Sequence, residues 1–178
     1  MFPSDQGSVI LLIGPSSVGK TAIASQLQRS LNGLWLIAGV DMFWSMLDER
    51  TLPEGDFRTD SDVMRHITRG WHRAVAALAS EGNNVIVDEL GLHPWWLSDW
   101  REILNDRRWW SVRLTASVAE LTRREAARAN RTAGMAGEDA AKGRGPDEFF
   151  DLVINTEALS VAACVSSIAK LISPFAIA

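Results

Sequence analysis

Short apolar runs alternate with longer segments of helical periodicity from one end of the chain to the other. The runs are continuous rather than alternating, which is typical of strands that are buried on both faces of a parallel sheet. Five such strands are predicted, at residues 9–13, 34–38, 84–89, 109–115 and 152–154. Helices are predicted between and after them, at about residues 19–30, 41–52, 60–80, 94–106, 117–130 and 157–171.

This order of elements predicts an α/β fold in which a five-stranded parallel sheet lies between two layers of helices. Two of the helices carry apolar residues at helical spacing that should face the sheet. They are Ile23, Leu27 and Leu31 in the first helix and Val63, Ile67, Trp71, Val75 and Leu78 in the third. The segment 131–146 has no clear period. Ligands of such sheets bind beyond the carboxyl ends of the strands, so the residues after each strand are the functional candidates.

The loop after the first strand fits the phosphate-binding pattern G-x-x-x-x-G-K-[ST] in the strand–loop–helix context that this pattern requires. Its residues are Gly14, Pro15, Ser16, Ser17, Val18, Gly19, Lys20 and Thr21. The two glycines let backbone N–H groups converge on phosphate oxygens. Lys20 can reach the β- and γ-phosphates, and the Thr21 hydroxyl can bind Mg²⁺. A chance match in a Gly/Ser loop is the alternative, but the context favours ATP and Mg²⁺ as ligands.

Three carboxylates follow predicted strands. Asp88 follows an apolar strand as a Walker B residue does, and we expect it beside Thr21 as a metal ligand rather than as a cap of the next turn. Glu89 can share that work or line the acceptor pocket. Asp41 follows the second strand, and we interpret it as the catalytic group that accepts the hydroxyl proton of the acceptor. An N-cap role in a helix that begins at residue 42 is compatible with that interpretation.

Three arginines, Arg124, Arg128 and Arg131, fall at i, i+4 and i+7 and share one helix face if the helix continues that far. We interpret them as catalytic groups on a short helical lid, about residues 123–146. Such a lid would close over the phosphates, stabilise developing charge and exclude water. The alternative is a salt-bridged surface helix that uses Glu120 and Glu125, and the sequence does not decide between the two.

The chain has eight tryptophans and no tyrosine. Trp44, Trp95 and Trp96 follow predicted strands, and we interpret them, with Glu89, as candidates for the wall of the acceptor pocket. Core packing is the alternative for these three. The tryptophans that we assign to the core are Trp35, Trp71 and Trp110. The histidines show no metal-binding spacing, and no role is assigned to His66, His72 or His93.

Composition limits the class of protein. With 178 residues, of which 47% are hydrophobic, the chain is expected to form one domain, residues 1–178. A net charge of −4 and a pI near 5.4 argue against a nucleic-acid binder. A single cysteine, Cys164, favours a reducing cytoplasm, and no apolar run is long enough for a membrane span. We expect a cytoplasmic protein with a small-molecule partner. Residues 174–178 of the chain are apolar and can join a homo-oligomer interface.

These motifs resemble the chloramphenicol 3-O-phosphotransferase family of P-loop kinases over nearly the whole chain. Besides the loop, the resemblance covers residues 34–41 (LWLIAGVD), 85–88 (VIVD), 124–136 (REAARANRTAGMA) and 150–156 (FDLVINT). It implies an adenylate-kinase-like fold and ATP-dependent phosphorylation of a small hydroxyl, with Asp41 as the base. It also implies that the lid arginines are Arg124, Arg128 and Arg131.

The chain departs from the family in two segments that border the acceptor pocket. Residues 53–60 are shorter than the family's insert, and residues 142–146 replace its usual histidine. The leading hypothesis is an ATP-dependent small-molecule O-phosphotransferase, of the antibiotic-resistance or natural-product-modifying kind. The alternatives are another P-loop kinase, acting on a sugar, nucleotide-sugar or nucleoside monophosphate, and a regulatory module that binds nucleotide without catalysis. The intact Lys20, Asp41 and Asp88 weigh against the regulatory module.

Overall fold

The structure is a computed structural model that describes residues 6–48, 60–127, 135–141 and 146–176. The strands are β1 (Val9–Ile13), β2 (Trp35–Gly39), β3 (Asn84–Glu89), β4 (Trp109–Thr115) and β5 (Leu152–Asn155). The helices are α1 (Lys20–Ser30), α2 (Val40–Trp44), α3 (Asp62–Ser80), α4 (Pro94–Ile103), α5 (Val118–Ala126), α6 (Met135–Ala141) and α7 (Val161–Ala176), with a 3₁₀ turn at Asp147–Phe149.

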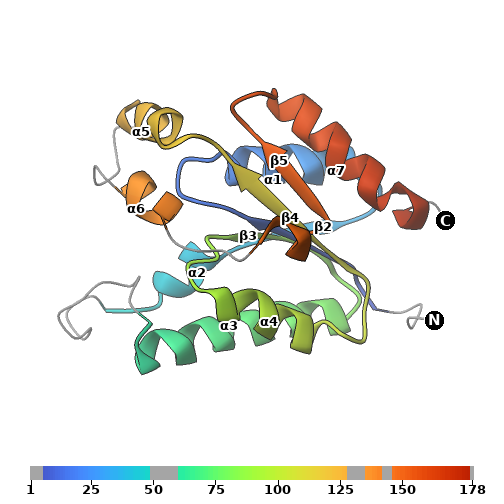
Figure 1. The fold of residues 1–178 in the computed structure, drawn as a ribbon. Coiled ribbons are helices and arrows are strands. Elements are labelled where there is room, and N and C mark those ends of the chain that lie inside the picture. Colours follow the sequence, from blue (N-terminus) through green and yellow to red (C-terminus); the bar gives the residue numbers. More distant parts are fainter. Residues whose placement is uncertain (1–5, 49–59, 128–134, 142–145, 177–178) are drawn as a thin grey trace.

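The five strands form one sheet in the order β2-β3-β1-β4-β5, and every neighbouring pair is parallel. Helices α3 and α4 cover one face of the sheet, and α1 and α7 cover the other (Figure 1). This confirms the predicted fold class. Leu12 of β1 and Gly39 of β2 both pair with Asp88 of β3. The loops that follow these three strands therefore leave the sheet at the same edge.

Alternate residues of the central strand supply two separate hydrophobic clusters, because successive side chains of a strand point to opposite faces. Ile10 and Leu12 pack on the side of α1 and α7, whereas Val9 and Leu11 pack on the side of α3 and α4. Each fully buried side chain of this size stabilises the fold by about 1.5–3 kcal/mol. The continuous apolar run of β1 is thus explained by burial on both faces.

The apolar stripe predicted for α3 is only partly right. Trp71 is buried as predicted, but Val63 and Leu78 are 42% and 39% exposed. The buried face instead includes His72, which is paired with Asp99 of α4. The histidine can be buried because the carboxylate of Asp99 compensates its polar ring. Hydrophobic periodicity cannot reveal such a partner.

Two helices differ from prediction because side chains or tight turns set their ends. Helix α2 ends at Trp44, not at residue 52, because the next N–H groups, those of Met46 and Leu47, form i→i+3 turns with the carbonyls of Phe43 and Trp44. Residues 49–52 of the predicted helix lie outside the described residues. Helix α7 begins at Val161, not near residue 157, and runs on to Ala176 rather than residue 171.

Side-chain caps set the starts of two helices. The hydroxyl of Ser160 accepts from the N–H of Ala163 at 3.2 Å at the start of α7, and Ser117 caps α5 through the N–H of Glu120 at 3.2 Å. Helix α4 ends at Ile103 rather than near residue 106. The segment 131–146, which has no clear period and is part of the predicted helical lid, contains α6. Within the described ranges no helix combines the length and apolar character needed to cross a membrane.

Candidate functional site

The loop between β1 and α1 is tightly curled. Ser17 and Gly19 have φ angles of 63° and 102°, and such left-handed residues turn backbone N–H groups towards one concavity. Gly14 lies close to β4, since a Cβ on it would be 2.6 Å from the carbonyl oxygen of Leu114. The first glycine of the pattern is therefore required by a close approach, and the last by its backbone conformation.

Lys20 folds back across this loop. Its Nζ donates to the carbonyl oxygens of Gly14 and Pro15, both at 2.9 Å, and lies 3.8 Å from Oδ1 of Asp88. The side chain is buried. A buried cation therefore lies beside the concavity into which the loop can receive an anion.

Thr21 and Asp88 meet at the same place. The Thr21 hydroxyl donates to Oδ2 of Asp88 at 2.7 Å, which joins the first turn of α1 to the end of β3. Mg²⁺ commonly takes one or two protein oxygens and fills its remaining positions with water and substrate phosphates. The described residues contain no group of three or more His, Cys, Asp or Glu arranged to hold a metal. This sparse pair of oxygens fits a Mg²⁺ ion that arrives with a nucleotide.

Asp41 lies in the first turn of α2 and is exposed. The N-cap of this helix is Gly39, and no side chain caps it. The capping role considered for Asp41 is therefore wrong, because the helix begins at Val40, two residues before the start that this role requires. Gly39 pairs with Asp88 in the sheet, so Asp41 follows the neighbouring strand at the same edge and is open to an incoming molecule.

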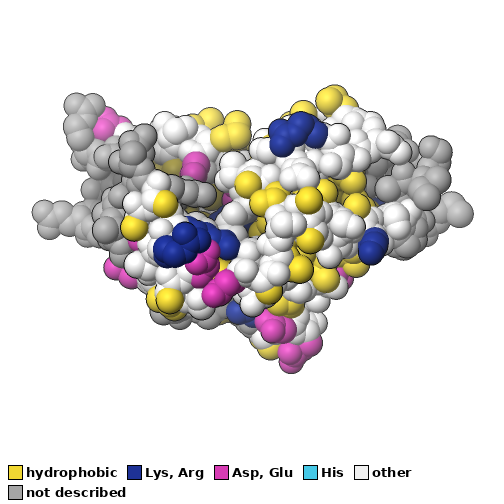
Figure 2. Space-filling model, turned by 90° about the horizontal axis from the view of Figure 1, so that it is seen from above, with side chains coloured by type: hydrophobic (Ala, Val, Ile, Leu, Met, Phe, Trp, Pro, Cys, Tyr) yellow, Lys and Arg dark blue, Asp and Glu magenta, His cyan; other side chains and the backbone are white. Residues whose placement is uncertain are grey.

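A cleft of about 500 Å³ lies beside the loop. Val18 and Gly19 line one side, Arg124 of α5 lines a second, and Leu159 and Cys164 line a third. Its volume is within the range of small-molecule sites. From above, basic and acidic side chains lie together over α5, and hydrophobic side chains gather over α7 (Figure 2). The cleft therefore combines a phosphate-type loop with partly apolar walls.

Arg124 is fixed in the wall of this cleft. Its guanidinium donates to the carbonyl oxygen of Val18 at 3.3 Å and to the hydroxyl and carbonyl oxygens of Thr156 at 3.0 and 2.9 Å. It also donates to Glu120 at 2.7 Å. These contacts join α5 to the loop and to the end of β5.

The alternative of a salt-bridged surface helix is correct for part of α5. Arg123 and then Arg124 lower the pKa of Glu120 to about 2. Glu125, in contrast, is buried at 4% exposure and does not belong to a solvated face. Arg128 and Arg131, the other predicted lid arginines, lie outside the described residues.

The tryptophans after β2 and β3 form one cluster. Trp96 is 2% exposed and packs with Leu90, while Trp44 and Trp95 are partly buried against them. The indole of Trp95 donates to Oδ1 of Asp60 at 3.0 Å. Trp96 is therefore a core residue, and Trp44 and Trp95 form an aromatic edge near the end of β3. Their interpretation as a wall of the acceptor pocket stays a prediction.

Glu89 does not share the site of Asp88. It is fully buried, and its carboxylate accepts from the Trp71 indole and from the N–H of Leu90, both at 3.1 Å. Adjacent residues of a strand point to opposite faces, so Glu89 faces α3 while Asp88 faces α1. Its interpretation as a metal-site or pocket residue does not agree with this burial.

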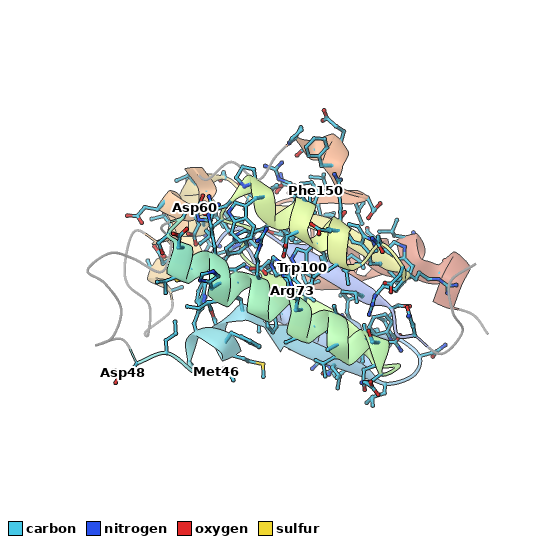
Figure 3. The ribbon with its side chains drawn as sticks, turned by 90° about the horizontal axis from the view of Figure 1, so that it is seen from below. Met46, Asp48, Asp60, Arg73, Trp100 and Phe150 are labelled. Atoms are coloured by element: carbon cyan, nitrogen blue, oxygen red, sulfur yellow. The ribbon has the colours of Figure 1, made fainter. Side chains whose placement is uncertain are left out.

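A buried charged cluster, which the sequence did not reveal, joins Glu89 to the helices. Nδ1 of His72 is 2.5 Å from Oδ2 of Asp99, and its Nε2 is 3.5 Å from Oε2 of Glu89. Arg69 and Arg73 approach Oδ1 of Asp99 to 3.4 and 3.8 Å. Figure 3 shows α3 and α4 side by side from below, with Arg73 and Trp100 in the region where they meet. The cluster thus connects β3, α3 and α4.

The electrostatics of the cluster favour a protonated histidine. Burial favours the neutral imidazole, but the carboxylates of Asp99 and Glu89 outweigh it, so the pKa of His72 is raised. Burial would raise the pKa of Asp99, but His72 and then Arg73 and Arg69 lower it. The ring of Trp100 lies 4.0 Å from the imidazole, centroid to centroid. In the sequence His72 stands beside Trp71 of the predicted apolar stripe but is not part of that stripe, so hydrophobic periodicity does not mark it as buried.

Solved structures of small kinases share this fold. The APS kinase CysC of Mycobacterium tuberculosis, solved with AMPPNP and APS, matches with a TM-score of 0.71 and 16% identity over 94% of this chain and 98% of that chain. A gluconokinase from Sinorhizobium meliloti 1021 matches with a TM-score of 0.64 and 15% identity, over 98% of this chain and 95% of that chain. At these identities the likeness establishes the fold alone.

Sequence comparisons reach further. A protein of Mycobacterium tuberculosis (strain ATCC 25618 / H37Rv), named "Putative O-phosphotransferase Rv2636", is 30% identical over 88% of this chain and 78% of its own length. The family described as "Chloramphenicol phosphotransferase-like protein" matches residues 7–173. The chain therefore belongs to the chloramphenicol phosphotransferase-like family.

Proposed function

We propose that this protein is an ATP-dependent O-phosphotransferase that transfers the γ-phosphate of ATP to a hydroxyl group of a small molecule. The observation that carries the proposal is the 2.7 Å contact between Thr21 and Asp88 beside a loop whose backbone and Lys20 suit a triphosphate. Family membership supports phosphotransfer. The name of the mycobacterial relative supports an oxygen atom as the acceptor.

The cleft and the loop together suit a nucleotide. The nucleoside would lie in the 500 Å³ cleft against the planar guanidinium of Arg124. The phosphates would take N–H groups of the loop, and Lys20 would exchange the carbonyls of Gly14 and Pro15 for phosphate oxygens. Mg²⁺ held by Thr21 and Asp88 would neutralise charge on the phosphates.

Asp41 suits the acceptor side of the reaction. Its carboxylate accepts the hydroxyl proton while the acceptor oxygen bonds to the γ-phosphorus. The bond from that phosphorus to the β–γ bridging oxygen breaks, and ADP leaves. In a loose transition state the hydroxyl becomes acidic late, so alignment of the carboxylate matters more than basicity. Trp44 and Trp95 offer an aromatic surface for an apolar acceptor, and the predicted lid arginines Arg128 and Arg131 would stabilise charge on the transferred group.

The test is ADP release with ATP and a panel of hydroxylated acceptors: chloramphenicol, other hydroxylated natural products, sugars and nucleoside monophosphates. We expect acceptor-dependent turnover that Lys20→Ala abolishes. Asp41→Asn should lower kcat by about 10²–10⁴-fold and leave the Kd for ATP unchanged. Glu81→Gln is the matched control. Glu81 is exposed and follows the last residue of α3, just before β3 begins, so it lies at the edge of the sheet opposite to Asp41.

The outcomes separate the alternatives. ATP binding without acceptor-dependent ADP release across the panel would favour a regulatory module. Phosphorylation of a sugar or a nucleoside monophosphate would favour another type of P-loop kinase. Undiminished turnover in Asp41→Asn would exclude Asp41 as the proton acceptor, and full activity in Lys20→Ala would exclude the phosphate-binding role of the loop.

A further inference from the structure

Helix α6 places a carboxylate directly on the phosphate-type loop. Oδ2 of Asp139 accepts a hydrogen bond from the backbone N–H of Ser16 at 3.1 Å. Asp139 is 0% exposed and Ser16 is 1% exposed. The contact joins residues that are 123 positions apart in the chain, so it depends on the folded arrangement of α6 and not on local loop geometry.

Packing of α6 fixes this carboxylate. Gly137 lies beside α5, because a Cβ on it would be in ordinary contact, at 3.8 Å, with the side chain of Val118 at the start of that helix. Ala140 packs against the hydrophobic cluster under α1 and α7. Asp139 lies between these two anchored positions. The helix is therefore seated on α5 and on the core in a way that directs one anion at the loop.

A carboxylate oxygen on a backbone N–H of this loop resembles a phosphate oxygen in charge and in hydrogen-bonding capacity. We infer that Asp139 is a built-in anion that competes with nucleotide phosphates for the loop, so that α6 lowers the affinity of the site for ATP. This inference rests on the proposed function, because it takes the loop to be the triphosphate site. The carboxylate both occupies a donor of the loop and repels incoming phosphates.

With competition of this kind, the apparent affinity equals the intrinsic affinity multiplied by the fraction of molecules in which the loop is open. A triphosphate has to displace the carboxylate or bind against its charge, and either cost rises with the charge of the ligand. The inhibition should therefore be strongest for ATP, weaker for ADP and weakest for AMP.

The experiment compares the Kd values of ATP, ADP and AMP, by isothermal titration calorimetry, for the wild type and three variants. Asp139→Asn keeps the shape and an acceptor for the Ser16 N–H but removes the charge. Asp139→Ala removes both. Glu138→Gln is the matched control, since it removes the same charge from the neighbouring, exposed position of α6. Thermal unfolding of each variant shows that the fold is retained, and Asp139→Asn carries the test if Asp139→Ala is unfolded.

We expect ATP to bind about tenfold more tightly to Asp139→Asn than to the wild type, with a smaller gain for ADP and AMP. Glu138→Gln should change the Kd less than twofold. Unchanged or weaker ATP binding in Asp139→Asn would overturn the inference, and so would an equal gain in Glu138→Gln. If neither the wild type nor any variant binds ATP, the proposed function itself fails. Binding by the wild type without a gain in Asp139→Asn refutes only the competition.

Discussion

The buried cluster of His72, Glu89 and Asp99 makes the sharpest prediction about stability. The substitution is His72→Gln, which keeps a side chain of similar reach and one amide donor but cannot carry a proton charge. Both carboxylates are almost completely buried. After the substitution one amide group cannot compensate two buried anions, and the ring contact with Trp100 at 4.0 Å is lost as well.

The magnitude follows from the burial of the ions. Removing one partner of a buried ion pair typically costs about 3–5 kcal/mol, because the other charge stays buried without compensation. Since Gln retains a donor, we expect about 3 kcal/mol, the lower end of that range. Domains of this size have total stabilities of about 5–15 kcal/mol. In a protein of this length the loss corresponds to a decrease in Tm of roughly 6–12 °C.

The pH dependence has a defined sign. The folded pKa of His72 is raised, so its stabilisation is complete below the unfolded pKa of about 6.5 and is lost as the pH rises through the folded pKa. The folded pKa of Asp99 is lowered, so its stabilisation is present above about pH 4 and is lost as the pH falls further. The gap between wild type and His72→Gln should be largest near pH 5–6.5. Above that range it should shrink by at most about 1.4 kcal/mol per pH unit.

The assay is urea unfolding of wild type and His72→Gln at pH 5.5, 7.0 and 8.5. His66→Gln is the control, because it removes an exposed imidazole from the same helix. We expect His66→Gln to follow the wild-type stability at all three pH values. Parallel pH dependence of wild type and His72→Gln would refute the charged cluster. A loss of less than 1 kcal/mol at pH 5.5, well below the cost of breaking a buried pair, would refute it too.

Three further predictions concern the loop and the cleft. Gly14→Ala should destabilise the fold by about 1–3 kcal/mol and weaken ATP binding, because its Cβ would meet a β4 carbonyl oxygen at 2.6 Å. The control Gly70→Ala, on an open surface of α3, should stabilise the fold by up to about 1 kcal/mol. Urea unfolding measures the stability of each variant, and calorimetry measures its ATP binding. Arg124→Ala should raise the Kd for ATP about tenfold, measured by calorimetry, since the cleft loses a wall that is bonded to the loop. Burial raises the pKa of the Cys164 thiol, so 5,5′-dithiobis(2-nitrobenzoate) should label it slowly in the native protein, more slowly with ATP in the cleft, and fully in urea.

Much of the fold could be predicted from the sequence because strand signals are local. The strands predicted at residues 9–13, 84–89 and 109–115 agree with β1, β3 and β4, and the other two strands agree within one residue. Buried parallel strands produce continuous apolar runs, and short loops with turn residues separate them. The loop at residues 14–21 could be predicted for the same reason, since its pattern, its strand and its helix are contiguous.

Features that depend on distant partners could not be predicted. His72 lies on a helix whose apolar residues suggested another face, and its burial depends on Asp99, 27 positions away. Asp139 belongs to a segment without a clear period, and its contact with Ser16 spans 123 positions. Composition and periodicity describe how a residue relates to its neighbours in sequence. They do not show which charged group will compensate a buried one across the fold.

The end of β3 shows why two adjacent acids have different roles. The sequence presents Asp88 and Glu89 as adjacent carboxylates after an apolar run, and it predicts Asp88 as a metal ligand and Glu89 as a residue that shares this work or lines the acceptor pocket. The pleat of the strand separates them: Asp88 turns to Thr21 and Lys20, and Glu89 turns to Trp71, which packs on α2 through Phe43 with ring centroids 5.0 Å apart. One strand end therefore supports the proposed metal site with one side chain and the helix of Asp41 with the next. A Glu89→Gln substitution should consequently lower the kcat for acceptor turnover more than it weakens ATP binding. Asp88→Asn, in contrast, should raise the Mg²⁺ concentration that both ATP binding and turnover require. Calorimetry and the ADP-release assay at varied Mg²⁺ concentration measure these effects.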